Sequence, residues 1–414
     1  MALPALALGW LLVASVPAVK YKTQVSLNSV VRTPLLTEES ETEVVTDLLL
    51  APRLDSELYT NRLDVKFVVE PQFFLRQVPL RTTFEFLLST YAWVEYKLRR
   101  DFSLVAVHTT TFGTFPLSDF RGAGGSDLPV GRGESQGFLL SSSYVYTETL
   151  AGFQGSFGVK RLMVAGTLGW IVNGLLDYPV HPPKRGDAAY PQQRLPQLRL
   201  EANYGATRRD YLTLLVFGQD VSFSTANRDA VLQVAPGIKH SFTPLVDVSV
   251  APGIALGRVY PRRRELEPYN VTMPTLETTL DAPVPLGHHW PVAARLRARY
   301  LPYMDPLSTQ LMPRAELGLD LKWEGRREAK VTGGVRYAHP LTSGLHREDQ
   351  EVRAEMEALL PLPLSRYLFM QAKGQFSWRH HAVLSFEPRE GTFSPVVQWF
   401  TSVGLVVRYD RGRL

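Results

Sequence analysis

Alternation of apolar and polar residues is the dominant pattern along this chain. It is clearest from Gln398 to Tyr409, where every second residue is Trp399, Thr401, Val403, Leu405, Val407 or Tyr409 and the residues between are smaller and more polar. Successive side chains of a β-strand point to opposite faces, so this stretch is predicted to be a strand with one apolar face. In a strand tilted by about 45°, its two terminal aromatics lie roughly 23 Å apart along a membrane normal. That spacing fits the aromatic girdles of an outer-membrane barrel, although an amphipathic strand of a soluble sandwich remains open at this point.

Short turns alternate with long polar connections along the rest of the chain. Tight turns are predicted at 60–62, 99–101, 160–161, 208–210, 243–245, 287–289, 324–327 and 362–365, and nine longer connections lie between the strands. Seventeen connections predict about eighteen strands, or sixteen if the two N-terminal strands are misread. The pattern is typical of an all-β, antiparallel up-and-down transmembrane barrel. A propeller would require a four-stranded sequence repeat, which the chain lacks.

Composition agrees with a single barrel domain. The chain has 414 residues, 45% of them hydrophobic, and its mean hydropathy is −0.08. After the N-terminal segment no run of 18 apolar residues predicts a spanning helix. No linker divides residues 19–414, which are therefore predicted to form one domain. The net charge of +5 is not gathered into a basic stripe with stacking aromatics, so nucleic-acid binding is not expected.

Residues 1–18 are predicted to be a secretory signal peptide. Ala2 to Val16 form an apolar run of the right length, and Ala18 is a small residue suited to cleavage. The run is not preceded by the usual Lys or Arg, which departs from the standard pattern. Lys20 and Lys22 then begin a strongly polar segment, which favours a signal peptide over a buried helix.

Charged residues on alternate positions predict a water-filled lumen. Arg295, Arg297 and Arg299 lie opposite an apolar face that runs from Trp290 to Tyr300, and an arginine facing lipid would cost about 2–4 kcal/mol near the midplane. The same alternation continues in the following strands, so the predicted pore-lining set is Arg295, Arg297, Arg299, Arg314, Glu316, Asp320, Lys322, Arg336, Arg353, Glu355 and Glu357. The aromatic girdle is predicted to contain Trp290, Tyr300, Trp323, Trp399 and Tyr409. A salt-bridged interior that serves only stability is the alternative to a conduit.

Other chemistry finds little support. There are no cysteines, which excludes disulfides and cysteine-based zinc sites. The pairs His288–His289 and His380–His381 would point to opposite faces of a strand, so no metal site is expected. No nucleophile elbow and no Ser-His-Asp pattern is present. We therefore expect neither a cofactor nor catalytic residues, and the chain is not predicted to be an enzyme.

Two stretches resemble known bacterial outer-membrane proteins. Ser402, Gly404, Val407 and Tyr409 resemble the C-terminal signal read by the barrel-assembly machinery, except that five residues follow the aromatic. Tyr21 to Gln72, with V-S-L-N-S, E-S-E-T-E and D-V-K-F-V-V-E-P-Q, resembles the opening of barrels associated with exopolysaccharide secretion. The second resemblance implies a barrel that works beside a periplasmic polysaccharide-export protein.

These observations predict an outer-membrane pore. The first hypothesis is a conduit for secreted polysaccharide, and the alternatives are a general diffusion porin and a structural or adhesive surface barrel. The expected partners are outer-membrane lipids and lipopolysaccharide, the barrel-assembly machinery and a periplasmic polysaccharide-export protein. The sequence does not identify the substrate, the direction of transport or the gate.

Overall fold

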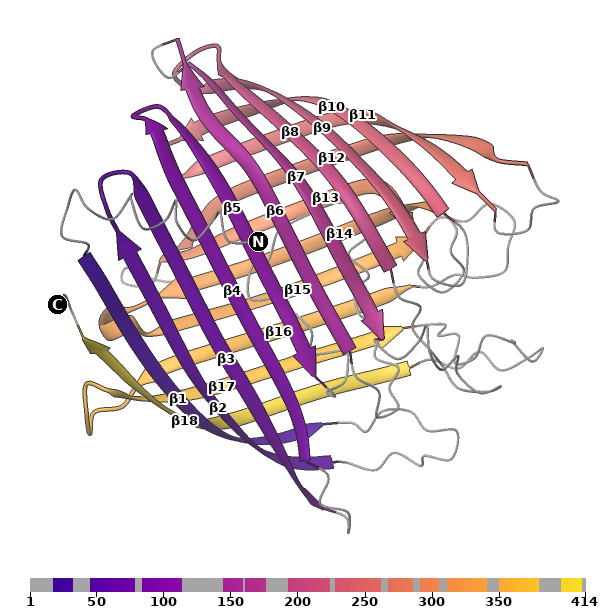
Figure 1. The fold of residues 1–414 in the computed structure, drawn as a ribbon. Coiled ribbons are helices and arrows are strands. Elements are labelled where there is room, and N and C mark those ends of the chain that lie inside the picture. Colours follow the sequence, from indigo (N-terminus) through magenta and orange to yellow (C-terminus); the bar gives the residue numbers. More distant parts are fainter. Residues whose placement is uncertain are drawn as a thin grey trace, which may run out of the picture.

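Eighteen antiparallel strands form one closed sheet among the described residues of a computed structural model of the chain (Figure 1). The structure describes residues 18–32, 45–78, 84–113, 144–158, 161–175, 193–223, 228–261, 267–285, 291–304, 311–340, 350–379 and 396–411. The predicted all-β barrel of eighteen strands is confirmed, and the count of sixteen is set aside. Among these residues no helix is long and apolar enough to cross a membrane.

The strands are long enough to cross a bilayer at a tilt, since about 9–11 residues are needed. They are β1 (Ala18–Arg32), β2 (Val45–Tyr59), β3 (Leu63–Val78), β4 (Phe84–Arg99), β5 (Phe102–Gly113), β6 (Tyr144–Phe157), β7 (Leu162–Leu175), β8 (Gln193–Gly205), β9 (Asp210–Phe223), β10 (Arg228–Thr243), β11 (Val246–Tyr260), β12 (Tyr269–Pro285), β13 (Pro291–Met304), β14 (Leu311–Glu324), β15 (Lys330–Pro340), β16 (Glu351–Pro361), β17 (Leu368–Arg379) and β18 (Val396–Arg411).

Each strand pairs with the next one along the chain, and β1 closes the barrel against β18. In this seam Asn28 lies opposite Gly404. A Cβ atom at Gly404 would collide with the side-chain oxygen of Asn28 and with the carbonyl of Leu27. Glycine is therefore required where the last strand approaches the first, which gives one position of the predicted assembly signal a local physical reason.

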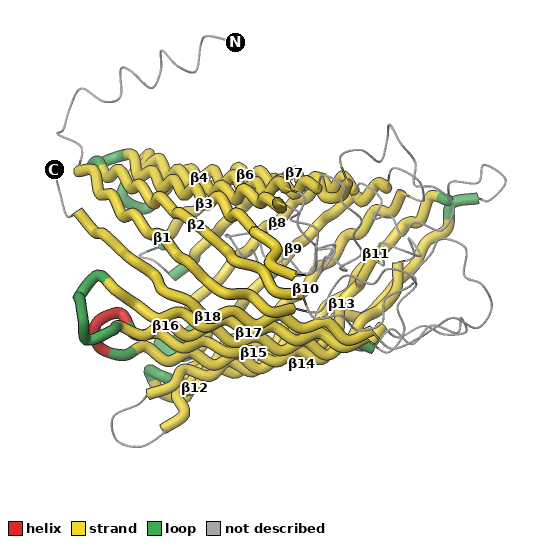
Figure 2. The backbone as a smooth tube through the Cα atoms, turned by 90° about the horizontal axis from the view of Figure 1, so that it is seen from below, coloured by secondary structure: helices red, strands yellow, loops and turns green. Residues whose placement is uncertain are grey.

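The two ends of the barrel differ in their connections (Figure 2). We call the end with the tight turns, such as 60–62 and 206–209, the turn end, and the opposite end, where β1 stops at Arg32, the loop end. Six of the eight predicted turns are fully described, and of the turn 160–161 only Arg161 is described. The turn 287–289 lies outside the described residues, as do most residues of the predicted long connections and residues 1–17 of the predicted signal peptide. Ala18, the last residue of that predicted peptide, is the first residue of β1.

Threonine hydroxyls close several turns at the turn end. Thr60 Oγ1 accepts a hydrogen bond from the backbone N–H of Leu63 at 2.7 Å, and Thr207 Oγ1 accepts one from the N–H of Asp210 at 3.0 Å. A hydroxyl in this position replaces part of a backbone turn. The residues between, which include several arginines, are therefore held at the tips of ordered hairpins.

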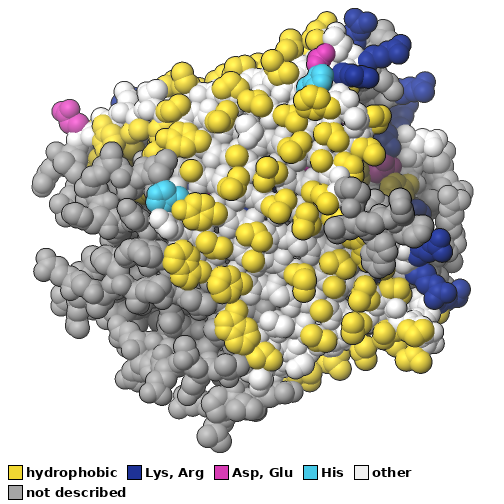
Figure 3. Space-filling view, turned by 180° about the vertical axis from the view of Figure 1, so that it is seen from behind, with side chains coloured by type: hydrophobic (Ala, Val, Ile, Leu, Met, Phe, Trp, Pro, Cys, Tyr) yellow, Lys and Arg dark blue, Asp and Glu magenta, His cyan; other side chains and the backbone are white. Residues whose placement is uncertain are grey.

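The barrel is apolar outside, as expected for a surface in contact with lipid. In β1, Val25 and Leu27 are 46% and 50% exposed, whereas Ser26 and Asn28 between and after them face the lumen and are buried. Apolar side chains are spread over the face of the barrel seen in Figure 3, and Lys and Arg side chains lie at its edge. Soluble monomers rarely expose an apolar surface of this extent, and a closed barrel leaves no unpaired strand edge in lipid. The soluble-sandwich alternative is therefore excluded, and the chain is a barrel of the bacterial outer membrane.

Candidate functional site

The lumen of β12–β14 contains a ladder of paired charges. Arg295, Arg297 and Arg299 occupy alternate positions of β13, on the face opposite the exposed Leu296. The register places Asp281 of β12 beside Arg295. Lumen-facing acids therefore stand on both sides of the arginine row, since Asp320 and Glu316 of β14 lie opposite Arg295 and Arg299.

Each of the three arginines forms an ion pair. Arg295 Nε lies 2.5 Å from Asp281 Oδ1, Arg297 Nη2 lies 2.9 Å from Asp320 Oδ2, and Arg299 Nε lies 3.7 Å from Glu277 Oε2. The Arg295 side chain is 49% exposed, whereas the other two are about 15% exposed. The ladder is thus most accessible near the turn end.

A second group of charges surrounds Glu351. One oxygen of Glu351 lies 3.4 Å from Arg314 Nη2, and the other lies 3.3 Å from Arg353 Nη2. Arg314 also approaches Glu316 at 3.3 Å and stacks on the ring of Tyr303, 4.6 Å from its centroid. The Arg314 side chain is only 7% exposed and that of Glu351 10%. Removing one member would therefore leave the remaining buried charges with fewer compensating contacts.

The remaining predicted lumen residues lie on β14–β16. Asp320 and Glu355 approach Gly334 from the two neighbouring strands, and a Cβ atom there would lie 2.9 Å from an Asp320 oxygen. Arg336 and Arg353 are direct neighbours in register. Two further pairs continue the row, Lys322 with Glu324 at 2.7 Å and Lys373 with Glu357 at 3.6 Å. The predicted residues therefore share one wall of the barrel.

Sequence reasoning did not assign the charges on the opposite wall. Arg53 of β2 lies 2.9 Å from Asp55 and 3.2 Å from Glu70, and Lys97 of β4 lies 2.5 Å from Asp64. The spacing of two residues between Arg53 and Asp55 was the available signal, because i and i+2 share a strand face. Paired charges therefore occur on both walls.

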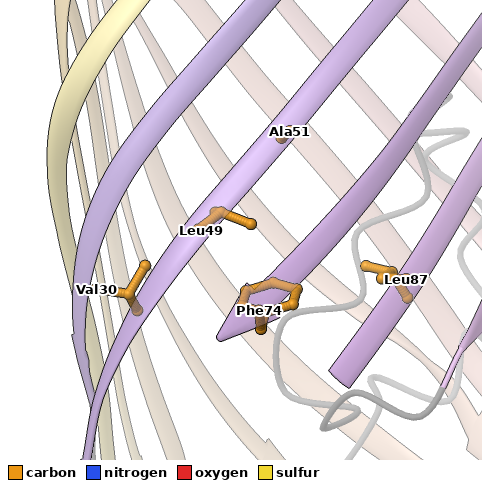
Figure 4. Packing of buried hydrophobic residues seen from close by; sticks show 5 residues of the cluster. All are labelled: Val30, Leu49, Ala51, Phe74 and Leu87. Carbon is orange, nitrogen blue, oxygen red and sulfur yellow. The ribbon is translucent and has the colours of Figure 1, made fainter. Parts of the chain in front are cut away.

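The half of the lumen nearer the loop end, which we call the loop half, is lined by buried side chains that include apolar clusters as well as charged residues such as Asp47, Glu148 and Asp229. On β1–β4, Val30, Leu49, Ala51, Phe74 and Leu87 form one cluster that faces inward (Figure 4). Apolar residues on lumen-facing positions were not predicted, because the same alternation that marks lipid-facing leucines also fits them.

A second inward cluster narrows the loop half. Ile171, Leu195 and Val221 project from β7–β9, and Leu311 at the start of β14 packs against them. A Cβ atom at Gly257 of β11 would collide with the Leu311 side chain. Leu311 therefore contacts lumen-facing residues that lie far around the barrel from its own strand, which marks a constriction.

Polar side chains interrupt this apolar zone on β8–β10. Gln197 and Gln219 lie opposite each other in register, and both are nearly fully buried. Their carboxamides form no hydrogen bond with any described residue. Because buried amides usually have partners, these groups are suited to contact a polar solute or water.

At the turn end the β14–β15 turn reaches the closing seam of the barrel. Glu328 lies 3.1 Å from Arg408 of β18 and 3.6 Å from Lys22 of β1. Arg327 and Glu328 both adopt positive φ, 55° and 62°, which is uncommon for residues with a side chain. The strained turn is held by ion pairs to the first and last strands.

The aromatic residues predicted for the girdle lie on the lipid-facing positions of their strands. Tyr409 is 51% exposed at the turn end of β18, where its ring is 6.1 Å from that of Tyr367. Tyr300, Trp323 and Trp399 are partly buried on the same kind of position. Trp290 lies outside the described residues.

Comparison with known proteins gives similarity of fold at low sequence identity. No protein family and no curated protein matches the sequence. The outer membrane protein opdK from Pseudomonas aeruginosa is 11% identical with a TM-score of 0.45, covering 95% of this chain and 99% of that chain. OccK2 (OpdF) from the same organism, in complex with glucuronate, is 11% identical with a TM-score of 0.45, covering 96% and 98%. The FrpB iron transporter from Neisseria meningitidis is 7% identical with a TM-score of 0.48, covering 94% and 81%.

At these values the likeness transfers neither a substrate nor a mechanism to this chain. The polysaccharide association implied by the N-terminal segment finds no support among these structures and stays a prediction. By its own geometry, the chain is an outer-membrane barrel of eighteen strands with paired charges along its lumen and a loop half narrowed by apolar clusters.

Proposed function

We propose that this protein is a passive diffusion pore for small polar solutes across the outer membrane. The observation that carries the proposal is the combination of paired charges on both walls of the lumen with a constriction around Leu311. The charged side chains require a wet environment, since a barrel of this size is too wide for side chains alone to fill. The predicted set from Arg295 to Glu357 lines the path in this proposal.

The pairing of charges favours a path with modest ionic preference. Arg297 has Asp320 within 2.9 Å, and Arg53 has two carboxylates within reach. A cation and an anion therefore meet both signs of charge along the wall. This arrangement suits a general porin better than a lumen built for one strongly charged polymer.

The constriction favours small solutes over a polysaccharide chain. Leu311 contacts both the β7–β9 cluster and the position of Gly257, so apolar side chains narrow the loop half. A constriction of this kind limits passage by its diameter. The buried carboxamides of Gln197 and Gln219 supply the polar contacts that a small solute would use.

Reconstitution into planar bilayers tests the pore itself. We expect discrete conductance steps, and we expect proteoliposomes to swell in small sugars but not in long dextrans. A silent bilayer would contradict any pore and favour a structural or adhesive barrel. Passage of long dextrans would instead support the hypothesis of a polysaccharide conduit.

Deleting the gene separates the small-solute pore from a polysaccharide conduit in the cell. The expected result is unchanged surface polysaccharide together with slower uptake of small polar solutes. Loss of the surface polymer, restored by the intact gene but not by a variant with a blocked lumen, would support export in place of diffusion.

A further inference from the structure

Exposed arginines lie on four successive hairpin tips of the turn end, and the β14–β15 and β16–β17 turns of the same end also carry Arg326, Arg327 and Arg366. The hairpin tips between β2 and β9 present Arg62, Arg99, Arg100, Arg161, Arg208 and Arg209, which we call the basic arc. All six are exposed, and none forms an ion pair with a described residue. Figure 3 shows Lys and Arg side chains along the turn-end edge of the molecule, next to the apolar band. The remaining described tight turn on a neighbouring hairpin, 244–245, is uncharged.

The arginines follow directly after lipid-facing apolar and aromatic residues. Leu98 is 50% exposed on the outer face and precedes Arg99. Tyr204, 44% exposed on the outer face of β8, lies at the base of the hairpin that presents Arg208 and Arg209. Aromatic residues on the lipid-facing surface mark the level of the membrane interface. The basic arc therefore lies at the level of the headgroups or just beyond it.

We propose that the basic arc binds the phosphate groups of anionic phospholipids in the leaflet at the turn end. Guanidinium groups bind phosphate through two parallel hydrogen bonds, and basic residues at a membrane surface attract anionic lipids. An acidic protein is the competing occupant. The lipid is favoured because the arc borders the apolar band along several successive hairpins, where a bilayer is always present.

Hydrogen bonds hold the backbone of these arginines in ordered hairpin tips. The backbone N–H of Arg209 donates to Thr207 Oγ1 at 3.1 Å, and its carbonyl accepts from the N–H of Ser241 on β10 at 2.9 Å. The same type of hydroxyl contact at Thr60 orders the tip that presents Arg62. An ordered tip loses less conformational entropy when it binds a headgroup.

Spin-labelled lipids test the proposal directly. The full chain is reconstituted in phosphatidylcholine vesicles that contain traces of labelled phosphatidylglycerol or labelled phosphatidylcholine, and the fraction of each label immobilised at the protein is measured. We expect the wild type to prefer phosphatidylglycerol about fivefold, the contribution of one arginine at a membrane surface. The preference should fall as salt is added, because the charges are exposed.

A matched pair of variants assigns the preference to the arc. In the variant R62Q/R99Q/R100Q/R161Q/R208Q/R209Q the preference should fall at least twofold, whereas the corresponding variant with six lysines should retain most of it. Circular dichroism and bilayer conductance should be unchanged in both, because none of these residues lines the lumen. If the glutamine variant does not fold, R208Q/R209Q alone is compared with R208K/R209K.

Two results would overturn the proposal. Equal association of both lipids with the wild type would show that the arc does not select anionic headgroups. An unchanged preference for phosphatidylglycerol in the glutamine variants would show that the lipid binds elsewhere on the barrel. An acidic protein would then be the better candidate partner of the basic arc.

Discussion

The arginines of the lumen and those of the basic arc differ in their surroundings. In the lumen, Arg297 lies 2.9 Å from Asp320 and is only 14% exposed, while Arg314 lies between Glu316 and Glu351. In the basic arc, Arg208 and its neighbours are exposed and make no ion pair with described residues. Arginine is therefore paired with acidic residues in the lumen wall, whereas in the basic arc it forms an exposed, positively charged surface.

This difference follows from the cost of desolvation. A charge inside a narrow barrel has limited access to water, so an uncompensated arginine there would be costly. A charge at a hairpin tip keeps its hydration and needs no partner. Lumen charges should therefore affect stability and ion selectivity, whereas charges of the basic arc should affect neither strongly.

Removing the acid shared by two lumen arginines should have the largest effect. The change Glu351→Gln removes the carboxylate shared by Arg314 and Arg353, while Glu316 still lies 3.3 Å from Arg314, and we expect a loss of about 1–3 kcal/mol in the free energy of unfolding. Urea titration of the refolded barrel in vesicles measures it. The matched change Asp101→Asn, on an exposed turn of the basic arc, should alter stability by less than about 0.5 kcal/mol. Equal losses in the two variants would remove the distinction between the regions.

Reversing three lumen charges should shift ion selectivity. In R295E/R297E/R299E the row becomes acidic beside Asp281 and Asp320, and the permeability ratio of cation to anion should rise by about tenfold. Reversal potentials in a salt gradient measure this ratio. The control R62E/R100E/R209E introduces the same charge change at the turn end and should shift the ratio less. No shift in the lumen variant would mean that these arginines do not line the path.

Shortening the side chain at the constriction should open the loop half. Leu311→Ala removes the packing against the cluster of Ile171, Leu195 and Val221, so we expect higher single-channel conductance. We also expect a loss of about 1–2 kcal/mol of stability, since Leu311 is only partly buried. Leu364→Ala, on an exposed turn, is the control and should change neither quantity. Lower conductance in the Leu311 variant would place the narrowest point elsewhere.

Neutralising one hairpin of the basic arc should have the smallest effect on the barrel itself. For R208Q/R209Q we expect stability within about 0.5 kcal/mol of the wild type and unchanged selectivity. Unfolding curves and reversal potentials measure the two quantities. A large loss of stability would show that these arginines have structural partners, contrary to the contrast with the lumen.

Much of the fold was predictable because the side-chain period of a strand is two. Alternation placed Arg295, Arg297 and Arg299 on one face, and the spacing of turns gave eighteen strands. The ion-pair partners of these arginines were harder to predict from the sequence. Arg297, for example, pairs with Asp320 although Gly318 is its neighbour in register. Such diagonal pairing depends on side-chain length and strand twist.

Contacts between segments that are far apart in the sequence could not be predicted from the sequence pattern. Glu328 reaches Lys22 and Arg408 at the seam, and Leu311 reaches the β7–β9 cluster. The inward apolar cluster around Phe74 was also missed, because period-two alternation does not distinguish an apolar face in contact with lipid from one in a narrowed lumen. Only closure of the barrel decides which face is inside.

The sequence by itself determined the strands, their number, the faces of the charged residues and the tight turns that carry arginine. Tertiary structure alone decided which charges meet, where the lumen narrows and that Gly404 must lie against Asn28 at the seam. The physical reason is that alternation and turn chemistry are local properties of the chain. Pairing across the lumen and closure of the first strand on the last depend on all eighteen strands at once.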